Sequence, residues 1–486
     1  MKRALIIVVM IAGAAFCFRH RLPANYSAQT VQSIPEIMIQ RNIRVSDNGG
    51  PFLEPCVSAY PNDPNVLVVS SSEVVKDGIL ANAFVTRDGG RAWTRSPLPE
   101  MRESLARREF VHALDTWSTV APNGIAYVSA LAAKRLDDGR WQTPIVVYRS
   151  TDRGQNWQGP TLIPGRSFDR PSIVATRDKV FIEAVASGKD TFVVKQPISA
   201  DVVSLLSSDD QGGSFQSMGY VAPDNLGRNS LNASLLPDDS VLLSYFDHPR
   251  NEGQRLTGGR LYIVKAMDGG RALDLPQFVA DVNRASNPGQ IAVDRSTGPF
   301  RGRVYAAWEG GSLMYLNPSN VRASANSGKS REVAIAYSTD EGLKWSTPVI
   351  LRGEESGPAY YANVVVNHDG VVGLAWLQHE RSQPERLCYR VYFAASLDGG
   401  KTFTSPRLVS DAVSCPDSKD NLAITYPPVG EQMVERFPRG GDYIGLTAAA
   451  DGSFHPVWID GRNGIFQVYT ARIEARRSEK ADSKLQ

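Results

Sequence analysis

The sequence predicts an all-β repeat protein, and three observations support that fold class. One turn motif, S-x-D-x-G-x-x-W/F, recurs along the 486 residues in four clear copies, a copy at 86–93 with Thr in place of Ser, and a decayed copy at 266–273. The spacings of 58 to 72 residues indicate a repeat architecture. Each copy follows a strand-like apolar run, such as PIVVYRS at 144–150 or EVAIAYS at 332–338. The 41 Gly and 30 Pro suit a turn-rich β protein. The central aspartates of the copies are Asp88, Asp152, Asp210, Asp268, Asp340 and Asp398.

The motif has a local physical logic that predicts a hairpin turn. Ser and Asp side chains hydrogen-bond nearby backbone N–H groups and hold a tight turn. Glycine supplies the positive φ that other residues resist. The terminal Trp or Phe leaves the turn and packs against a neighbouring unit. We therefore expect these aspartates to be structural residues rather than catalytic ones.

The copies resemble the Asp-box (BNR) repeats of the sialidase superfamily, most clearly STDRGQNW at 150–157 and SLDGGKTF at 396–403. The resemblance covers residues 42–473 and implies a single β-propeller of four-stranded antiparallel blades, with each motif in the turn between the third and fourth strands. Inner-strand starts align seven times, which predicts seven blades. Six blades remain the alternative, because the family is six-bladed. The last unit lacks an outer strand, and we expect NIRVS at 42–46 to supply it and close the ring.

Composition and the chain ends predict an exported protein. The 53 Lys and Arg barely exceed the 51 Asp and Glu, which argues against a nucleic-acid surface. Lys2 and Arg3 precede an apolar run over 4–18, so residues 1–28 are interpreted as a signal peptide or an uncleaved signal anchor. Residues 29–41 would be a linker and 474–486 a charged, disordered tail. We expect a secreted or periplasmic monomer that meets a membrane only through its N-terminal segment.

Two cysteines are placed to form a disulfide. Cys388 and Cys415 flank one motif, 27 residues apart, and an oxidising compartment would let them pair. Such a bridge stabilises the folded state by about 3 kcal/mol in the chain-entropy model. Cys56 is left over and is interpreted as a small buried apolar residue.

Polar residues at the starts of the inner strands form the candidate site. Because neighbouring strands are antiparallel, these starts lie on the face opposite the motif turns. We expect the aligned residues to ring the mouth of the axial channel, where convergent polar groups favour binding. The alternative is that they cap backbone groups of the next blade. The aligned positions are Glu54, Asp115, Asp169, Ser230, Asn287, Tyr360 and Asp442.

The resemblance implies a particular chemistry at this mouth. Sialidases use three arginines for the substrate carboxylate, an aspartate acid/base, and a tyrosine nucleophile assisted by a glutamate. No local motif assigns these roles here, and Arg44 in IRVS is only a faint echo of the family's arginine motif. The catalytic candidates are Asp115, Asp169, Tyr360, Tyr443, Glu54 and Asp442. The substrate-binding candidates are Arg170, Arg381, Arg439, Arg462 and Asp460.

Charge at the mouth favours some ligands over others. Four of the seven aligned positions are acidic, which would repel an anionic sugar and suit a neutral glycan or a bound Ca²⁺. Clustered carboxylates also raise one another's pKa, as a general acid requires. The leading hypothesis is an exported, carbohydrate-active propeller, an exo-glycosidase with no resident cofactor. The alternatives are a non-catalytic propeller that binds glycans or proteins, and an anchored structural surface protein.

Overall fold

The computed structural model describes residues 35–99, 110–165, 167–221, 226–249, 259–267, 272–282, 289–309, 332–354, 357–380 and 386–477. All of the described residues belong to one compact unit, Ile34–Ser478. Within the described ranges, no helix is both long and apolar enough to cross a membrane.

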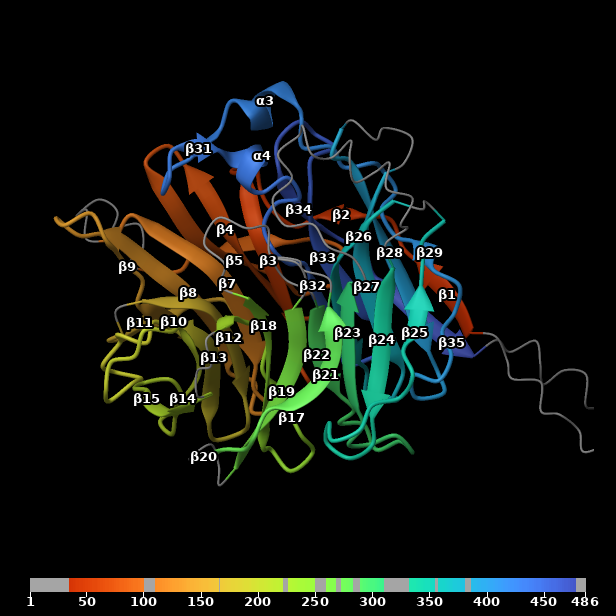
Figure 1. Ribbon diagram of the computed structural model, residues 1–486. Helices are drawn as coiled ribbons and strands as arrows, with labels where there is room; N and C mark the ends of the chain where they lie inside the picture. Colours follow the sequence, from red (N-terminus) through yellow and green to blue (C-terminus); the bar gives the residue numbers. More distant parts are fainter. Residues whose placement is uncertain are drawn as a thin grey trace, which may run out of the picture. The chain divides into compact units, whose positions relative to one another are not determined.

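The unit is nearly all β and is built from antiparallel sheets (Figure 1). Three of the sheets contain four consecutive strands each. The first contains β12 (Phe168–Ala175), β13 (Val180–Ala186), β14 (Val202–Ser208) and β15 (Gln216–Tyr220). The second contains β22 (Gly289–Val293), β23 (Val304–Glu309), β24 (Val333–Ser338) and β25 (Val349–Leu351). The third contains β26 (Ala359–Val366), β27 (Val372–His379), β28 (Tyr389–Ser396) and β29 (Arg407–Leu408).

Two larger sheets contain the same kind of unit with additions. In the first, two units join through one parallel pair, Ile79 opposite His112. Its strands are β3 (Phe52–Ala59), β4 (Leu67–Val75), β5 (Gly78–Thr86), β6 (Thr94–Ser96), β7 (His112–Val120), β8 (Ala126–Arg135), β9 (Trp141–Gln142), β10 (Ile145–Ser150) and β11 (Gln158–Ile163). The second contains β16 (Leu226–Ser230), β17 (Ser234–Leu235), β18 (Val241–Pro249), β19 (Gly259–Met267), β20 (Ala272–Leu273) and β21 (Gln277–Val282).

The last sheet joins the two ends of the unit. It contains β32 (Gly445–Ala448), β33 (Phe454–Asp460) and β34 (Gln467–Thr470), and β34 pairs with β2 (Ile43–Arg44) from the front of the chain. This is the outer position expected for NIRVS. Beyond it, β1 (Pro35–Ile39) pairs with β35 (Ile473–Arg477). The predicted linker 29–41 and tail 474–486 are therefore wrong for these two strands, which pair along five residues each.

The motif turns have the expected hydrogen bonds. In the turn after β10, Ser150 Oγ donates to Asp152 Oδ1 (2.8 Å) and accepts from Gly154 N (2.9 Å), while Asn156 N donates to the same carboxylate (2.9 Å). Trp157 is buried, and its Nε1 donates to Ser96 Oγ of the preceding unit (3.0 Å). The same Ser/Thr-to-Asp bond recurs at Asp88, Asp210, Asp340 and Asp398. These aspartates are structural, and Asp268 lies outside the described residues.

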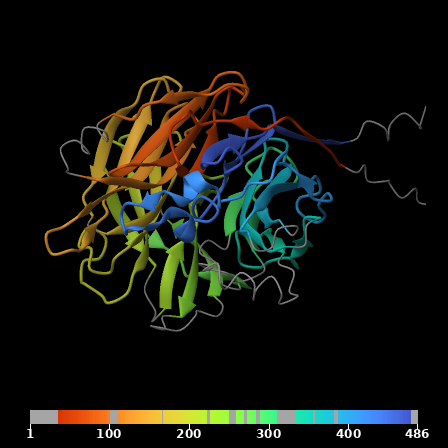
Figure 2. The ribbon, with the colours of Figure 1, turned by 90° about the horizontal axis from the view of Figure 1, so that it is seen from above.

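The innermost strands surround one shared cavity. The strand β3 contacts β7 and β32, β7 contacts β12, and β26 contacts β22 and β32. Among the described residues, segments of β3, β7, β12, β22, β26 and β32, together with residues 232–234, line a cavity of about 280 Å³. Figures 1 and 2 show the sheets following one another in chain order around a common centre, so that the first strands lie beside the last.

The motif turns and the strand starts lie at opposite ends of the sheets. Leu67 pairs with both Ala59, the end of β3, and Thr86, which opens the first motif turn. Glu54 lies near the other end of β3. The expected separation of the turns from the candidate site is therefore present.

Candidate functional site

Four inner strands carry the same strained bulge near their starts. The pairing register shifts between Leu53 and Cys56, and it shifts at the matching place in β7, β12 and β26. Each shift contains a residue other than glycine with φ near +55°, a conformation that costs about 1–3 kcal/mol and gathers at functional sites. These residues are Glu54 (55°), Asp115 (51°), Arg170 (53°) and Tyr361 (57°).

The bulges correct the predicted alignment. Pairing resumes at Cys56, Trp117, Ser172 and Asn363, two residues after each positive-φ residue. The true counterparts of Glu54 and Asp115 are therefore Arg170 and Tyr361. Asp169 and Tyr360 each lie one position earlier. All four strands carry the bulge at the same place, so the offset of one residue in β12 and β26 comes from where the alignment placed the strand ends.

Three carboxyl groups from these strands meet. Glu54 and Asp115 lie within hydrogen-bonding reach of each other, and so do Asp115 and Asp169. Two carboxyl groups hydrogen-bond only when one holds a proton. Glu54 is 5 % exposed, Asp115 is half-buried, and Asp169 reaches solvent. The group thus extends from the protein interior to an accessible carboxyl at Asp169.

Burial and mutual repulsion raise the pKa of all three groups. Burial is the largest cause at Glu54 and, with the negative charge of Asp442, raises its pKa to about 7. Burial and the Glu54 carboxylate raise the pKa of Asp115 well above its usual range. Protein crowds Asp169 on most sides although its side chain reaches solvent, and this crowding and Asp115 raise its pKa. The cluster therefore retains protons near neutral pH.

One buried arginine balances the cluster. Arg170 Nη2 pairs with Asp442 Oδ2 at 2.8 Å, and the Arg170 backbone N–H donates to Asp115 Oδ2 (3.4 Å). Burial disfavours the charged guanidinium, but the attraction of Asp442, Asp169 and Asp115 outweighs it and raises the pKa of Arg170. The guanidinium of Arg170 is therefore the positive charge that lies beside these carboxylates.

The segment before β32 supplies backbone groups to the cluster. Gly440 O accepts from Glu54 N (2.8 Å), and Gly441 O accepts from Tyr361 Oη (2.7 Å). Gly441 has φ +119°, and a Cβ there would stand 2.2 Å from Glu54 Cγ. The Arg439 guanidinium lies 3.5 Å from the centre of the Tyr360 ring. Glycine is required at 441 because of both its backbone conformation and its contact with Glu54.

The tyrosines are held by backbone carbonyls. Tyr443 Oη donates to Thr116 O (3.2 Å), as Tyr361 Oη does to Gly441 O. Burial raises the pKa of both phenols well above the usual value. Neither hydroxyl is bonded to a carboxylate that could remove its proton. At Tyr443 and Tyr361, this arrangement departs from the tyrosine nucleophile that the sialidase resemblance implies.

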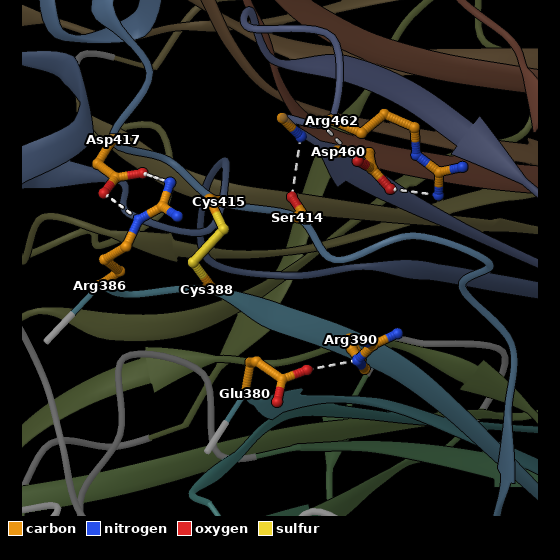
Figure 3. The surroundings of a disulfide bond; sticks show 10 residues. Glu380, Arg386, Cys388, Arg390, Ser414, Cys415, Asp417, Asp460 and Arg462 are labelled. Carbon is orange, nitrogen blue, oxygen red and sulfur yellow. Dashed lines mark hydrogen bonds and ion pairs between the residues drawn. A yellow bond between two sulfur atoms is a disulfide. The ribbon is translucent and has the colours of Figure 1, made fainter. Parts of the chain in front are cut away.

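Some candidates are used elsewhere in the structure. Arg462 Nη2 donates to Asp460 Oδ2 (2.8 Å) and Asn42 Oδ1 (2.9 Å), and Trp458 Nε1 also donates to Asp460 (2.9 Å). These bonds fasten the front of the chain to the last sheet, and Figure 3 shows the pairing of Arg462 with Asp460. Ser230 Oγ donates to the buried carboxylate of Glu183 (3.0 Å).

Arg44 lies on the outer strand β2, away from the inner strand starts. Arg44 is exposed on β2 and bonds to Asn48, so its likeness to the family motif has no counterpart at the site. Arg381 and Asn287 lie outside the described residues.

The predicted disulfide is present and fastens the segment that reaches the cluster (Figure 3). Cys388 at the start of β28 is bonded to Cys415, and Arg386 forms two bonds of 2.6 Å with Asp417. After these anchors come α3 (Lys419–Leu422), β30 (Thr425–Tyr426), β31 (Glu431–Gln432) and α4 (Met433–Arg436), and then Gly440 to Asp442.

The sequence reasoning missed several site residues. It did not include Tyr361 among the catalytic candidates, and it overlooked Tyr426, a buried phenol of β30 whose pKa is raised by burial and by the nearby carboxylates of Glu54 and Asp115. It also assigned no role at the site to the Gly440–Gly441 pair. Two adjacent glycines before the seventh inner strand were the one signal that could have revealed this close backbone approach.

Comparisons with known proteins give no family. No family model matches the chain, and no curated protein matches it. Among solved structures, a protein of unknown function from Dyadobacter fermentans has a TM-score of 0.45 and 16% identity, covering 71% of this chain and 95% of that one.

Two other similar solved structures are those of enzymes. An α-L-arabinofuranosidase from Fusarium graminearum has a TM-score of 0.48 and 11% identity, covering 74% of this chain and 98% of that one. A Hadza microbial sialidase has a TM-score of 0.44 and 12% identity, covering 93% and 94%. Such low identities and scores decide neither the fold nor the activity of this chain.

Proposed function

We propose that residues 42–473 form a seven-bladed β-propeller closed by β2. The support is the shared cavity, which is lined by segments of β3, β7, β12, β22, β26, β32 and residues 232–234. The pairing of β2 with β34 and the contact of β3 with β32 further support closure. A six-bladed ring would leave one of these segments away from the axis.

We propose that the protein is a glycoside hydrolase whose active site is the carboxyl cluster at the axial mouth. The observation that supports this most is the convergence of the strained bulges. They bring Glu54, Asp115 and Arg170 from three inner strands to one place, together with Asp169. Stored backbone strain and raised carboxyl pKa values together are typical of acid–base sites.

The geometry suggests a role for each group. Asp169 is exposed and has a raised pKa, so it donates a proton to the leaving oxygen. Asp115 lies between Asp169 and Glu54 and shares protons with both. Asp442, ion-paired with Arg170, is the carboxylate that accepts a proton from the attacking water. The acidic surroundings favour a neutral glycan over a sialoside.

A substrate panel tests the proposal. Neutral aryl glycosides and an aryl sialoside are incubated with the wild type and with Asp169→Asn and Asp442→Asn. We expect release from a neutral glycoside and a loss of about 100-fold or more in each variant, as is usual when a general acid or base is removed. Asp152→Asn, in a motif turn, serves as the matched control.

The panel also separates the alternative of a non-catalytic binding protein. Binding of a neutral glycan without release from any aryl glycoside would overturn the hydrolase and leave a glycan-binding propeller. Release of sialic acid with no hydrolysis of neutral glycosides would overturn the substrate assignment.

We further propose that the protein is exported. The Cys388–Cys415 bridge supports an oxidising compartment, because disulfides rarely persist in the cytosol of mesophiles. Cell fractionation tests this proposal, and recovery of the protein with reduced Cys388 and Cys415 in the cytosol would contradict it.

A further inference from the structure

The axial cavity begins directly beneath the carboxyl cluster. Cys56 and Trp117 line it, and each lies two residues after a cluster member on the same strand. The lining continues along the inner strands to Ser58, Thr119 and Thr447, within one residue of the strand ends. The cavity therefore runs from the cluster toward the face that carries the motif turns.

The lining mixes neutral polar and apolar side chains and carries no charge. Among the described residues, no charged side chain lines the cavity. Hydroxyl and amide groups recur in the lining, as at Ser118, Ser172, Gln290 and Asn363. The volume of about 280 Å³ far exceeds the roughly 10–15 Å³ that one water needs. Neutral hydrogen-bonding groups around so large a space suit water rather than an ion.

One buried donor at the cluster end of the cavity has no hydrogen-bond partner among the described residues. Trp117 is 8 % exposed, and its Nε1 atom has no hydrogen-bond partner among the described residues. Its ring lies 5.2 Å from that of Tyr443, at the cluster end of the cavity. A buried donor without an acceptor costs about 1–3 kcal/mol.

We propose that the cavity is a water-filled shaft that supplies the carboxyl site from the face opposite the substrate. This rests on the proposed hydrolase function. Hydrolysis consumes one water per glycosidic bond: the water oxygen bonds to the anomeric carbon, the glycosidic C–O bond breaks, Asp169 gives its proton to the leaving oxygen, and Asp442 takes one from the water. A glycan in the mouth blocks entry from its own side, so the shaft keeps water available.

Cys56 allows the shaft to be tested without any activity. It is the free cysteine of the described residues, 8 % exposed, with its thiol 3.9 Å from Ser118 O. The native full-length protein is treated with methyl methanethiosulfonate or with fluorescein maleimide, and the label at Cys56 is quantified by peptide mapping. We expect the small reagent to react at least tenfold faster than the bulky one. Reaction of either reagent only in denaturant would overturn the shaft.

A substitution that narrows the far end of the cavity tests the role of the shaft in water supply. Ser234 lines the cavity on β17, away from the cluster, so Ser234→Leu narrows it while Ser234→Ala leaves it open. With folding verified by circular dichroism, we expect the Leu variant to slow Cys56 labelling tenfold and to lower kcat severalfold at unchanged KM. The Ala variant should change neither.

The two failures are distinguishable. Slower labelling with unchanged kcat would overturn the supply role. Absence of hydrolysis in the wild type would instead overturn the proposed function, while the labelling still reports on the shaft.

Discussion

Gly441→Ala perturbs the site at its tightest contact. At φ +119°, an L-residue costs about 1–3 kcal/mol. The new Cβ would also stand 2.2 Å from Glu54 Cγ, where ordinary contact begins at 3.4 Å, so the carboxyl or the segment must move by about 1 Å. We expect a destabilisation of about 2–4 kcal/mol and a loss of kcat/KM on the order of 100-fold, because a 1 Å misplacement has that scale.

Gly430→Ala is the matched control in the same segment. Gly430 has φ +72°, but nothing lies within 4 Å of the point that a Cβ would occupy there, so the substitution carries the backbone cost alone, about 1–2 kcal/mol. Urea denaturation of both variants isolates the effect of the contact with Glu54. Equal losses of stability in both variants, with full activity in Gly441→Ala, would refute the placement of Gly441 against Glu54.

Three further predictions concern pH, the disulfide and the turns. Folding raises the pKa of Glu54 from 4.5 to about 7, so this group contributes roughly 3 kcal/mol below pH 4.5 that is lost as pH rises through 7; Glu54→Gln should remove that pH dependence from urea unfolding curves. Replacing Cys388 and Cys415 together by Ser should cost about 3 kcal/mol and speed hydrogen exchange at Glu54 N, which bonds to Gly440 O; unchanged exchange would show that the bridge does not hold this segment. Asp152→Ala should cost about 2 kcal/mol with kcat unchanged, and a catalytic loss there would contradict its structural role.

The local features were predictable because short-range chemistry determines them. The motif turns need only Ser, Asp and Gly within five residues, as in Ser150 to Gly154. The strand NIRVS at 42–46 was predictable because the last unit of the sequence lacks an outer strand. The Cys388–Cys415 pair was predictable because the two cysteines flank one motif in a protein expected to be exported. The opposite placement of turns and strand starts followed from antiparallel order.

The details of the site were not predictable because they depend on long-range packing. The alignment placed the ends of β12 and β26 one residue off, and it therefore assigned to Asp169 and Tyr360 the places that Arg170 and Tyr361 occupy. Arg462 faces the same end as the cluster in the alignment, yet bonds to Asn42, 420 positions earlier. The approach of Gly441 to Glu54 depends on how the disulfide-fastened segment packs, which no periodicity in the sequence encodes.

The pKa of Glu54 in the wild type and in Asp442→Asn tests the central claim, which is that remote segments bring these charges together. It is obtained from the pH dependence of unfolding free energy, each protein being compared with its Glu54→Gln counterpart. The substitution removes a negative charge and frees that of Arg170, and both changes favour ionised Glu54. We predict a pKa clearly below the wild-type value of about 7. An unchanged pKa would contradict the shared axial site.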